Sequence, residues 1–203
     1  ANTLTVNAAI NKTSGTDATL SLYGGTIDIN SSISSSSGRL DLRLDGGTID
    51  VSAPISLNDG NLTIFTNGTS TLGGVFSDGN LLKYGNGELI LTEANAYTRT
   101  YVIAGTLSIS SDANLGTLPA ETTHNMIYIQ GGRLKTTTDM TINSKRGIYL
   151  NNANAYIEVA DDTTLTYDGI ISGTNASYDL VLNNSGTTGT LVLGGTSTYT
   201  GST

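Results

Sequence analysis

The 203-residue chain contains no cysteine, so it forms neither a disulfide nor a thiolate metal site. It has two prolines, too few for a proline-rich linker. The chain has nine basic and seventeen acidic residues, so its formal net charge is −8. Lys145-Arg146 is the single pair of adjacent basic residues in the sequence. Nucleic-acid binding requires clustered positive charge, so it is disfavoured. No apolar run is long enough for a transmembrane helix.

The polar bulk of the chain comes from glycine, serine, threonine and asparagine rather than from charge, since charged residues make up only 13%. Helix is disfavoured throughout, because glycine and the turn-forming polar residues are frequent and no helical apolar spacing is sustained. Pairs of apolar residues at period 2 predict short strands instead. In the first third of the chain these pairs are Leu4/Val6, Leu20/Leu22, Ile27/Ile29, Leu40/Leu42, Ile49/Val51 and Leu62/Ile64.

The predicted strands recur as a set at a nearly constant interval. Gly24-Gly-Thr-Ile-Asp28 returns as Gly46-Gly-Thr-Ile-Asp50, with its residue numbers raised by 22, and Ile33 returns at the same shift as Ile55. Leu4, Val6 and Ile10 return as Ile27, Ile29 and Ile33 at a shift of 23, and the Leu40/Leu42 pair returns as Leu62/Ile64 at a shift of 22. One shift shared by several strands predicts a solenoid with three strands and three corners per coil. A coil of roughly 22 residues predicts about nine turns of a parallel β-helix for the whole chain. The expected core is Leu20, Leu22, Ile27, Ile29, Ile33, Leu42, Leu44, Ile49, Val51, Ile55, Leu89, Leu91, Leu191 and Leu193.

A longer motif repeats at a shift of 102 in residue number. Gly87, Leu89, Leu91 and the pair Tyr97-Thr98 return as Gly189, Leu191, Leu193 and Tyr199-Thr200. The second copy carries about seven extra residues, which we place in the polar stretch 183–189. The predicted organisation is one β-helix over 1–203, a segment of a longer protein. Within it, simple coils occupy 1–72 and 119–168, and the two motif-bearing blocks occupy 73–118 and 169–203.

Residues 73–118 resemble the passenger-associated transport repeat of Gram-negative autotransporters. The matching residues are Leu82-Lys83, Gly85-Asn-Gly87-Glu-Leu89-Ile-Leu91, Asn95-Ala-Tyr97-Thr98 and Gly105-Thr-Leu107. Residues 1–72 are similar to the haemagglutinin-type repeats of two-partner-secretion exoproteins. Two departures are Arg99-Thr-Tyr101 after the first Tyr-Thr, and Leu180-Val-Leu182 in place of a Leu-Lys strand. The resemblance implies a right-handed β-helix, secretion through an outer-membrane pore to the cell surface, and a role in adhesion and virulence.

No catalytic, cofactor-binding or metal site is predicted, and the chain is not expected to be an enzyme. His124, the only histidine, is interpreted as a solvated loop residue. Asp28 and Asp50 alternate with apolar residues, so we interpret them as an outward-facing ladder in solvent. The alternative is a β-helical carbohydrate-active enzyme, such as a polysaccharide lyase or a phage tailspike. That alternative predicts carboxylates clustered with Lys or Arg on neighbouring coils, beside a long loop.

Tyr97 and Tyr199 are interpreted as structural residues whose rings cover the aliphatic row while their hydroxyls stay in solvent. The other tyrosines, Tyr101, Tyr128, Tyr149 and Tyr156, are candidates for an outer surface on which sugars stack. The function indicated is that of a rigid stalk and binding scaffold in a secreted adhesin. Its expected partners are a host-cell surface or glycan and the secretion pore.

Overall fold

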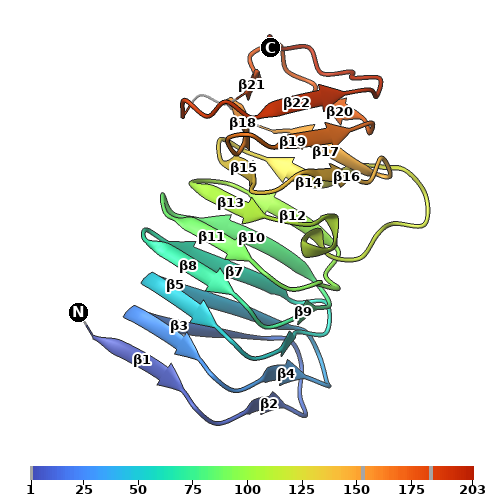
Figure 1. The fold of residues 1–203 in the computed structure, drawn as a ribbon. Coiled ribbons are helices and arrows are strands. Elements are labelled where there is room, and N and C mark those ends of the chain that lie inside the picture. Colours follow the sequence, from blue (N-terminus) through green and yellow to red (C-terminus); the bar gives the residue numbers. More distant parts are fainter. Residues whose placement is uncertain (1, 152–153, 183–184) are drawn as a thin grey trace.

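Short parallel strands follow one another around three faces of an elongated, right-handed coil (Figure 1). The computed structural model describes residues 2–151, 154–182 and 185–203. Each circuit of three faces is a coil here, and coils stack from the N-terminal to the C-terminal end of the rod (Figure 1). The predicted all-β, parallel solenoid is confirmed.

The first and third faces form one continuous sheet, because β3 and β5 each bend around the corner between them. The first face contains β1 (Thr3–Val6), the C-terminal parts of β3 (Ala18–Ile29) and β5 (Leu40–Val51), β8 (Thr69–Leu72), β11 (Glu88–Leu91), β13 (Thr106–Ile109), β15 (Arg133–Thr136), β18 (Ala155–Val159) and β21 (Leu180–Leu182). The third face contains the N-terminal parts of β3 and β5, then β7 (Asn61–Thr66), β10 (Asn80–Tyr84), β12 (Arg99–Val102), β14 (Thr123–Ile129), β17 (Arg146–Leu150) and β20 (Ile171–Ser172).

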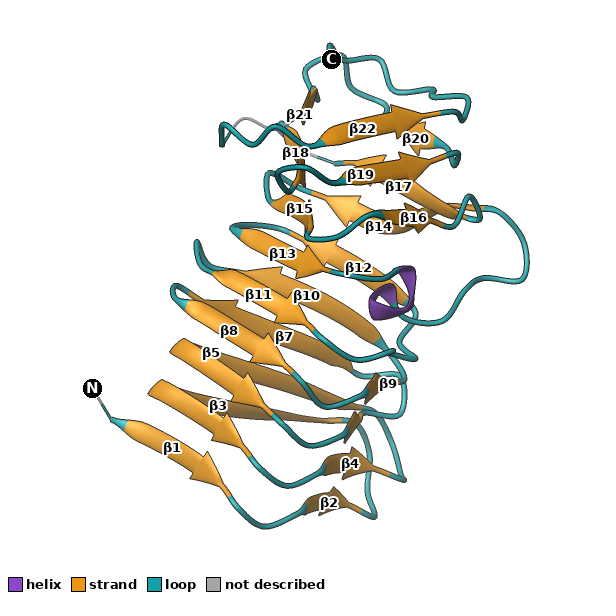
Figure 2. Cartoon of the chain, viewed as in Figure 1, coloured by secondary structure: helices purple, strands orange, loops and turns teal. Residues whose placement is uncertain are grey.

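The second face is interrupted in the middle of the rod. Its N-terminal sheet is β2 (Ile10–Lys12), β4 (Ile33–Ser35), β6 (Ile55–Ser56) and β9 (Phe76–Ser77). Its C-terminal sheet is β16 (Met140–Ile142), β19 (Thr164–Tyr167) and β22 (Thr190–Leu193). Between the two sheets lie a single bridge from Ser77 to Ala96 and the 3₁₀ helix η1 (Asp112–Leu115), drawn in purple in Figure 2. The expectation that helix is absent throughout is wrong at this one turn, where Ser111 accepts a hydrogen bond from the backbone N–H of Ala113.

The register of the first coils follows the predicted repeat. Ile27 pairs with Ile49, and Ile33 pairs with Ile55, as the predicted interval requires. The interval predicted for Leu40 and Leu62 is wrong, because Leu62 pairs with Leu42 instead, at a shift of 20 rather than 22 in residue number. The cause is a shorter corner before β7, where Asn58 and Asp59 adopt left-handed φ angles of 50° and 66°. Gly60 stacks so closely on Leu40 that a Cβ would lie 1.8 Å from the Leu40 carbonyl oxygen.

Coil length varies along the rod, so the chain makes about eight turns rather than nine. The pairing of Leu89 with Leu107 defines a shorter coil than the pairing of Leu107 with Leu134, since the residue numbers differ by 18 in the first pair and by 27 in the second. The longer coil includes η1 and the loop of residues 116–122, which projects from the rod in Figure 1. The first two residues of the predicted polar stretch 183–189 lie outside the described residues.

The inward columns form one apolar core along the rod. All predicted core residues between Ile27 and Leu91 are buried, whereas those at the ends are not fully covered. Leu20, Leu22 and Leu191 are half-buried, and Leu193 is 42% exposed, so its predicted burial is wrong. Leu193 lies on β22, the last strand of its sheet, and no coil covers it in the structure. Among the described residues, no helix has the length and apolarity needed to cross a membrane.

Candidate binding surfaces

The first motif forms a buried corner on the interrupted second face. The Tyr97 ring is fully buried and stacks on Phe76, with 5.4 Å between ring centroids. Its hydroxyl lies 3.0 Å from the Thr100 hydroxyl and donates to the Asn114 carbonyl oxygen at 3.2 Å. The expectation of a solvated hydroxyl is therefore wrong, since polar partners inside the core replace water. Burial raises the pKa of the Tyr97 phenol.

Two asparagines complete this corner by pairing with the backbone. The Asn95 side-chain oxygen accepts from the Phe76 N–H at 2.8 Å, and its amide donates to the Asn114 carbonyl oxygen at 3.0 Å. The Asn114 side-chain oxygen accepts from the backbone N–H groups of residues 110 and 111. These bonds join three successive coils where no strand ladder runs, so side chains replace the ladder as backbone partners. We call Asn95, Tyr97, Thr100 and Asn114 the polar corner.

Arg146, at the start of β17, closes the loop that follows η1. It is 1% exposed, and its guanidinium donates to the carbonyl oxygens of Leu115, Gly116 and Thr117 at 2.6–3.1 Å. Its Nε also donates to an Asp112 carboxylate oxygen at 3.0 Å. A buried guanidinium is stable only when its donors are satisfied, and here one arginine satisfies the end of a helical turn that has no strand partner.

The rest of the first motif serves coil stacking. Leu89 and Leu91 are buried, and a Cβ on Gly87 would lie 2.1 Å from the Gly68 carbonyl oxygen. Thr98 is exposed, and its N–H donates to the Gly79 carbonyl oxygen at 2.7 Å. Nothing in this set faces an open site.

The second motif lies on a different face from the first. Gly189 directly precedes β22 and Leu191 lies within it, and β22 pairs with β19 on the second face. In the first motif, by contrast, Leu89 lies in β11 on the first face. Tyr199 is half-buried and Thr200 is exposed, and the Thr198 N–H bonds to Ile171 on the third face. Sequence similarity at this long interval therefore does not give the same rotational position around the rod.

Lys83 lies in an inward column of the third face, although its residue type favours solvent. It is 0% exposed, and its ammonium donates to the carbonyl oxygens of Tyr84, Gly85 and Ala104 at 2.8–3.2 Å. Burial lowers the pKa of Lys83 to about 8. Lys83 belongs to the stretch that resembles the transport repeat, but a lysine at this position does not by itself predict an inward side chain.

The remaining titratable candidates are His124 on the third face and the Asp28–Asp50 pair on the first face. His124 is exposed but lies in β14, so its assignment to a loop is wrong. Asp28 and Asp50 pair in register on the outer side of the first face, where Asp28 is half-buried and Asp50 is exposed. Within the described residues, no group of three or more histidine or carboxylate side chains is gathered as a metal site.

Tyrosines form a ladder on the outer side of the third face. Tyr101, Tyr128 and Tyr149 pair in register. The first two rings stack at 4.6 Å between centroids with planes 12° apart, and the Tyr128 and Tyr149 rings lie 5.4 Å apart. Tyr156 is separate, because it lies on β18 of the first face. Stacking covers the facing surfaces of the Tyr101 and Tyr128 rings, whereas the Tyr149 ring is tilted by 59° from that of Tyr128.

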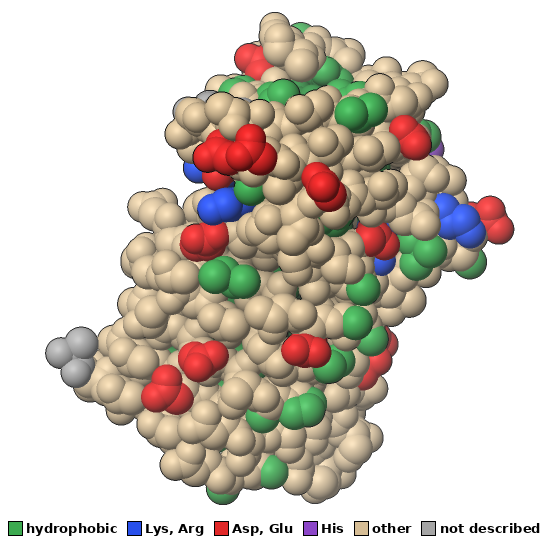
Figure 3. All heavy atoms as spheres, in the orientation of Figure 1, with side chains coloured by type: hydrophobic (Ala, Val, Ile, Leu, Met, Phe, Trp, Pro, Cys, Tyr) green, Lys and Arg blue, Asp and Glu red, His purple; other side chains and the backbone are tan. Residues whose placement is uncertain are grey.

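Charged side chains meet on the outer side of the first face. Glu158 is 6% exposed, and its carboxylate lies 3.1 Å from Arg133 Nε and 3.9 Å from Lys135 Nζ. Lys135 also lies 3.5 Å from Glu88, which belongs to an earlier coil than Glu158. Figure 3 shows acidic and basic side chains side by side at this level of a mostly uncharged surface. We call Glu88, Arg133, Lys135 and Glu158 the ion-pair row.

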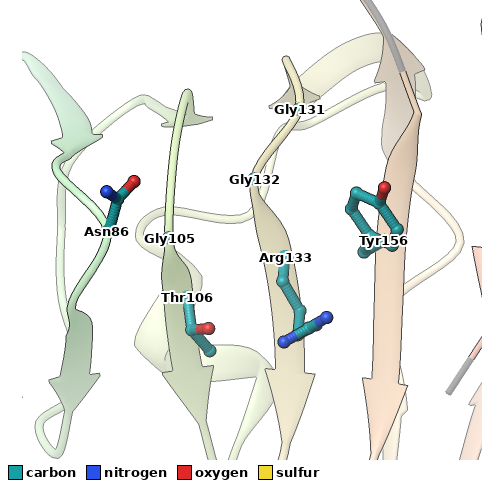
Figure 4. Close-up of a pocket in the computed structure, with 7 residues that line it drawn as sticks. All are labelled: Asn86, Gly105, Thr106, Gly131, Gly132, Arg133 and Tyr156. Carbon is teal, nitrogen blue, oxygen red and sulfur yellow. The ribbon is translucent and has the colours of Figure 1, made fainter. Parts of the chain in front are cut away.

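A pocket of about 310 Å³ opens beside the ion-pair row, at the corner between the third and first faces. It is lined by Asn86, Gly105, Thr106, Gly131, Gly132, Arg133 and Tyr156. Figure 4 shows Asn86 on one side, Tyr156 on the other, and the corner glycines between them. We call this the corner pocket.

Comparison with known proteins finds a relative among autotransporter adhesins. The chain is 35% identical over 116 residues to the adhesin BmaC autotransporter of Brucella suis biovar 1 (strain 1330), an alignment that covers 55% of this chain. The chain spans about 3% of that protein's length. No protein-family model matches the chain, and no solved structure does. The predicted resemblance to an autotransporter adhesin passenger is confirmed by this relative.

Proposed function

We propose that this chain is a rigid β-helical segment of an autotransporter-type adhesin, secreted and displayed on the bacterial surface, whose sides bind a host-cell surface. The observation that carries the proposal is similarity to an adhesin autotransporter over half the chain, in a fold of stacked, in-register coils. Secretion through an outer-membrane pore, by the autotransporter route rather than the two-partner route, accords with this relative.

The fold suits reach and display because successive coils are stabilised in largely the same way. Along the rod, rows of aliphatic side chains are buried, and strands pair with those of neighbouring coils except where the second face is interrupted. Length is therefore added without a new core. The outer side chains of each face remain available for contacts, and the absence of cysteine leaves no disulfide to block passage of an unfolded chain through a pore.

Adhesion is tested with latex beads coated with the purified chain and applied to cultured epithelial cells. We expect saturable bead attachment that free chain competes away, and equal attachment after nuclease treatment of the cells. Beads coated with heat-unfolded chain are the matched control. Attachment that free folded chain does not reduce would contradict the adhesive role.

A second candidate, carbohydrate cleavage, is favoured by the ion-pair row, because the enzyme alternative predicts carboxylates beside Lys or Arg on neighbouring coils. In this row, however, both carboxylates are occupied. Glu158 pairs with Arg133 at 3.1 Å, and Glu88 pairs with Lys135 and accepts a hydrogen bond from Ser108. Neither carboxylate is placed as a general acid facing an open cleft.

We expect no new reducing or unsaturated ends when the chain is incubated with polygalacturonate or alginate. A product that forms with the natural chain and disappears with Glu158→Gln would establish the enzyme instead of the scaffold.

A further inference from the structure

We propose that the corner pocket binds one neutral saccharide unit of a glycan. The inference deepens the proposed function by naming a ligand class for one surface of the rod. The pocket spans four successive coils, since Asn86 precedes β11, Thr106 begins β13, Arg133 begins β15 and Tyr156 lies on β18. Its volume of about 310 Å³ lies at the lower end of small-ligand sites, so it suits a single ring rather than a long chain segment.

Glycines keep the pocket open because the close stacking of the coils leaves no room for side chains at these positions. A Cβ on Gly105 would lie 2.4 Å from carbonyl oxygens of the coil below, and one on Gly132 would lie 2.7 Å from a Val102 methyl. The coils can stack here only without side chains. The result is a floor of backbone between two outward side chains, Asn86 and Tyr156, as Figure 4 shows.

Charge around the pocket is balanced, which favours a neutral ligand. Arg133 carries the positive charge in the lining, and Glu158 lies 3.1 Å from its Nε. Lys135, the next cation, lies between Glu88 and Glu158 at 3.5 and 3.9 Å. The ion-pair row has equal numbers of positive and negative groups, and the whole chain carries −8, so a uronate, sialate or phosphate gains no net attraction.

Tyr156 is the aromatic side chain suited to a sugar ring. In the tyrosine ladder, Tyr101 and Tyr128 cover each other's faces at 4.6 Å. In register, Tyr156 has Arg133 below it and Val181 above it, and no aromatic neighbour. The Arg133 guanidinium lies over one face of the Tyr156 ring, 5.5 Å from its centroid, and pairs with Glu158. Ring and guanidinium are therefore held in place before a ligand arrives, and a sugar would use the other face or the edge of the ring. A pyranose presents C–H groups to a ring and hydroxyls to its rim, where the Asn86 amide and the Thr106 hydroxyl offer donors and acceptors.

Saccharide-observed saturation-transfer NMR with the whole 203-residue chain tests the site. The probes are methyl glycosides of glucose, galactose, mannose and N-acetylglucosamine, with methyl galacturonate and sialyllactose as anionic probes. We expect saturation of at least one neutral glycoside, with at least a tenfold loss of affinity in Tyr156→Ala and in Asn86→Ala. Tyr149→Ala is the matched control, because it removes an outward tyrosine outside the pocket. It should leave binding within twofold of the natural chain.

Circular dichroism and melting temperature establish that each variant is folded, and Asn86→Ala retains a readout if Tyr156→Ala unfolds. Absence of neutral binding, binding unchanged in both pocket variants, or stronger binding of the anionic probes would each overturn the proposal. None of these results would affect bead attachment to cells, so failure of this site and failure of the adhesive role are distinguishable.

Discussion

The coils of residues 1–72 and the block of residues 73–118 differ in how their faces pair and how their interiors are filled. The first region has strands on all three faces and fills its interior with aliphatic columns such as Ile27 and Ile49. The second loses the strand ladder on one face and fills that corner with Tyr97, Asn95 and Asn114, each hydrogen-bonded inside the core. Apolar burial is non-directional and tolerates variation, whereas a buried polar network requires every partner. Stability in the second region should therefore depend on individual hydrogen-bond partners as well as on apolar burial.

Among the substitutions that test this difference, Arg146→Ala should cause the largest loss of unfolding free energy. Arg146→Ala removes the donors to three carbonyl oxygens and leaves Asp112 unpaired, and breaking a buried charged arrangement costs roughly 3–5 kcal/mol of unfolding free energy. Urea denaturation followed by circular dichroism measures it. Arg39→Ala is the control, because the Arg39 side chain is 46% exposed beside Asp41, where solvent screens the ion pair, so its loss should be far smaller. Similar losses for both variants would remove the distinction between the regions.

Tyr97 tests whether the block has a special role in transport. Tyr97→Ala should cost roughly 3–5 kcal/mol, comparable to the roughly 2–5 kcal/mol for Ile49→Ala in the regular coils. Tyr97→Phe, which removes only the hydroxyl, should cost roughly 1–3 kcal/mol because the buried Thr100 hydroxyl loses its partner and the Asn114 carbonyl loses one of its donors.

Surface labelling of cells that express the full-length protein then compares display of the two alanine variants. We expect Tyr97→Ala to lower display more than Ile49→Ala, because the block has partly local contacts that form early and hinder return through the pore. Equal display at matched stability would show that the block consists of ordinary coils.

The register of the coils could be predicted from the sequence only in part. The register of Ile27 on Ile49 was predictable because two coils share corners of equal length and nearly identical residues. The register at Leu62 was not, since the shorter corner depends on left-handed conformations at Asn58 and Asp59, which a period alone does not reveal. Coil length also changes between the two motif copies, since Leu89 pairs with Leu107 and Leu107 with Leu134. A constant interval therefore does not return the second motif to the face of the first.

The candidate surfaces were less predictable than the fold. Tyr101, Tyr128 and Tyr149 were candidates for an outer surface, but only the register shows that they stack and that Tyr156 is separate. The corner pocket combines residues from four coils whose lengths differ, so no single period brings them together. The hydrogen-bond partners of Tyr97 and Arg146 could not be predicted, because they include backbone carbonyl oxygens, which carry no residue-type signal.

Lys83 offers a pH-dependent test of the buried polar interior. Its pKa is lowered from 10.5 in the unfolded chain to about 8 in the folded protein. Between these values the unfolded chain binds more protons than the folded one, so the free energy of unfolding rises as the pH rises from about 8 to 10.5. At about 1.4 kcal/mol per pKa unit, the rise is roughly 3 kcal/mol. Denaturant titrations at pH 7.5 and 10.5 should show it in the natural chain and not in Lys83→Met. An equal rise in both would mean that Lys83 does not titrate as described.

The smallest expected effect belongs to the regular coils. Asp28→Ala should change the free energy of unfolding by no more than about 0.5 kcal/mol, because Asp28 and Asp50 are solvated on the outer side of the rod. Calorimetry on the two proteins at neutral pH measures it. A loss above about 2 kcal/mol, which exceeds what solvated surface substitutions cost, would reveal a partner for this carboxylate. It would also reveal a directional interaction in the region assigned to aliphatic packing.

Arg146 also has a mechanical consequence. Strands cross the rod, so the hydrogen bonds between coils run along its axis, and tension on the rod peels coils from an end a few bonds at a time. The guanidinium joins β17 to carbonyl oxygens 29–31 residues earlier in the chain, on the preceding coil. It therefore adds a side-chain clamp to the backbone ladder in the part of the rod where one face has no strand. Under tension along the rod, peeling from the C-terminal side should pause at this clamp. Single-molecule stretching should record the pause as a force step that Arg146→Ala abolishes.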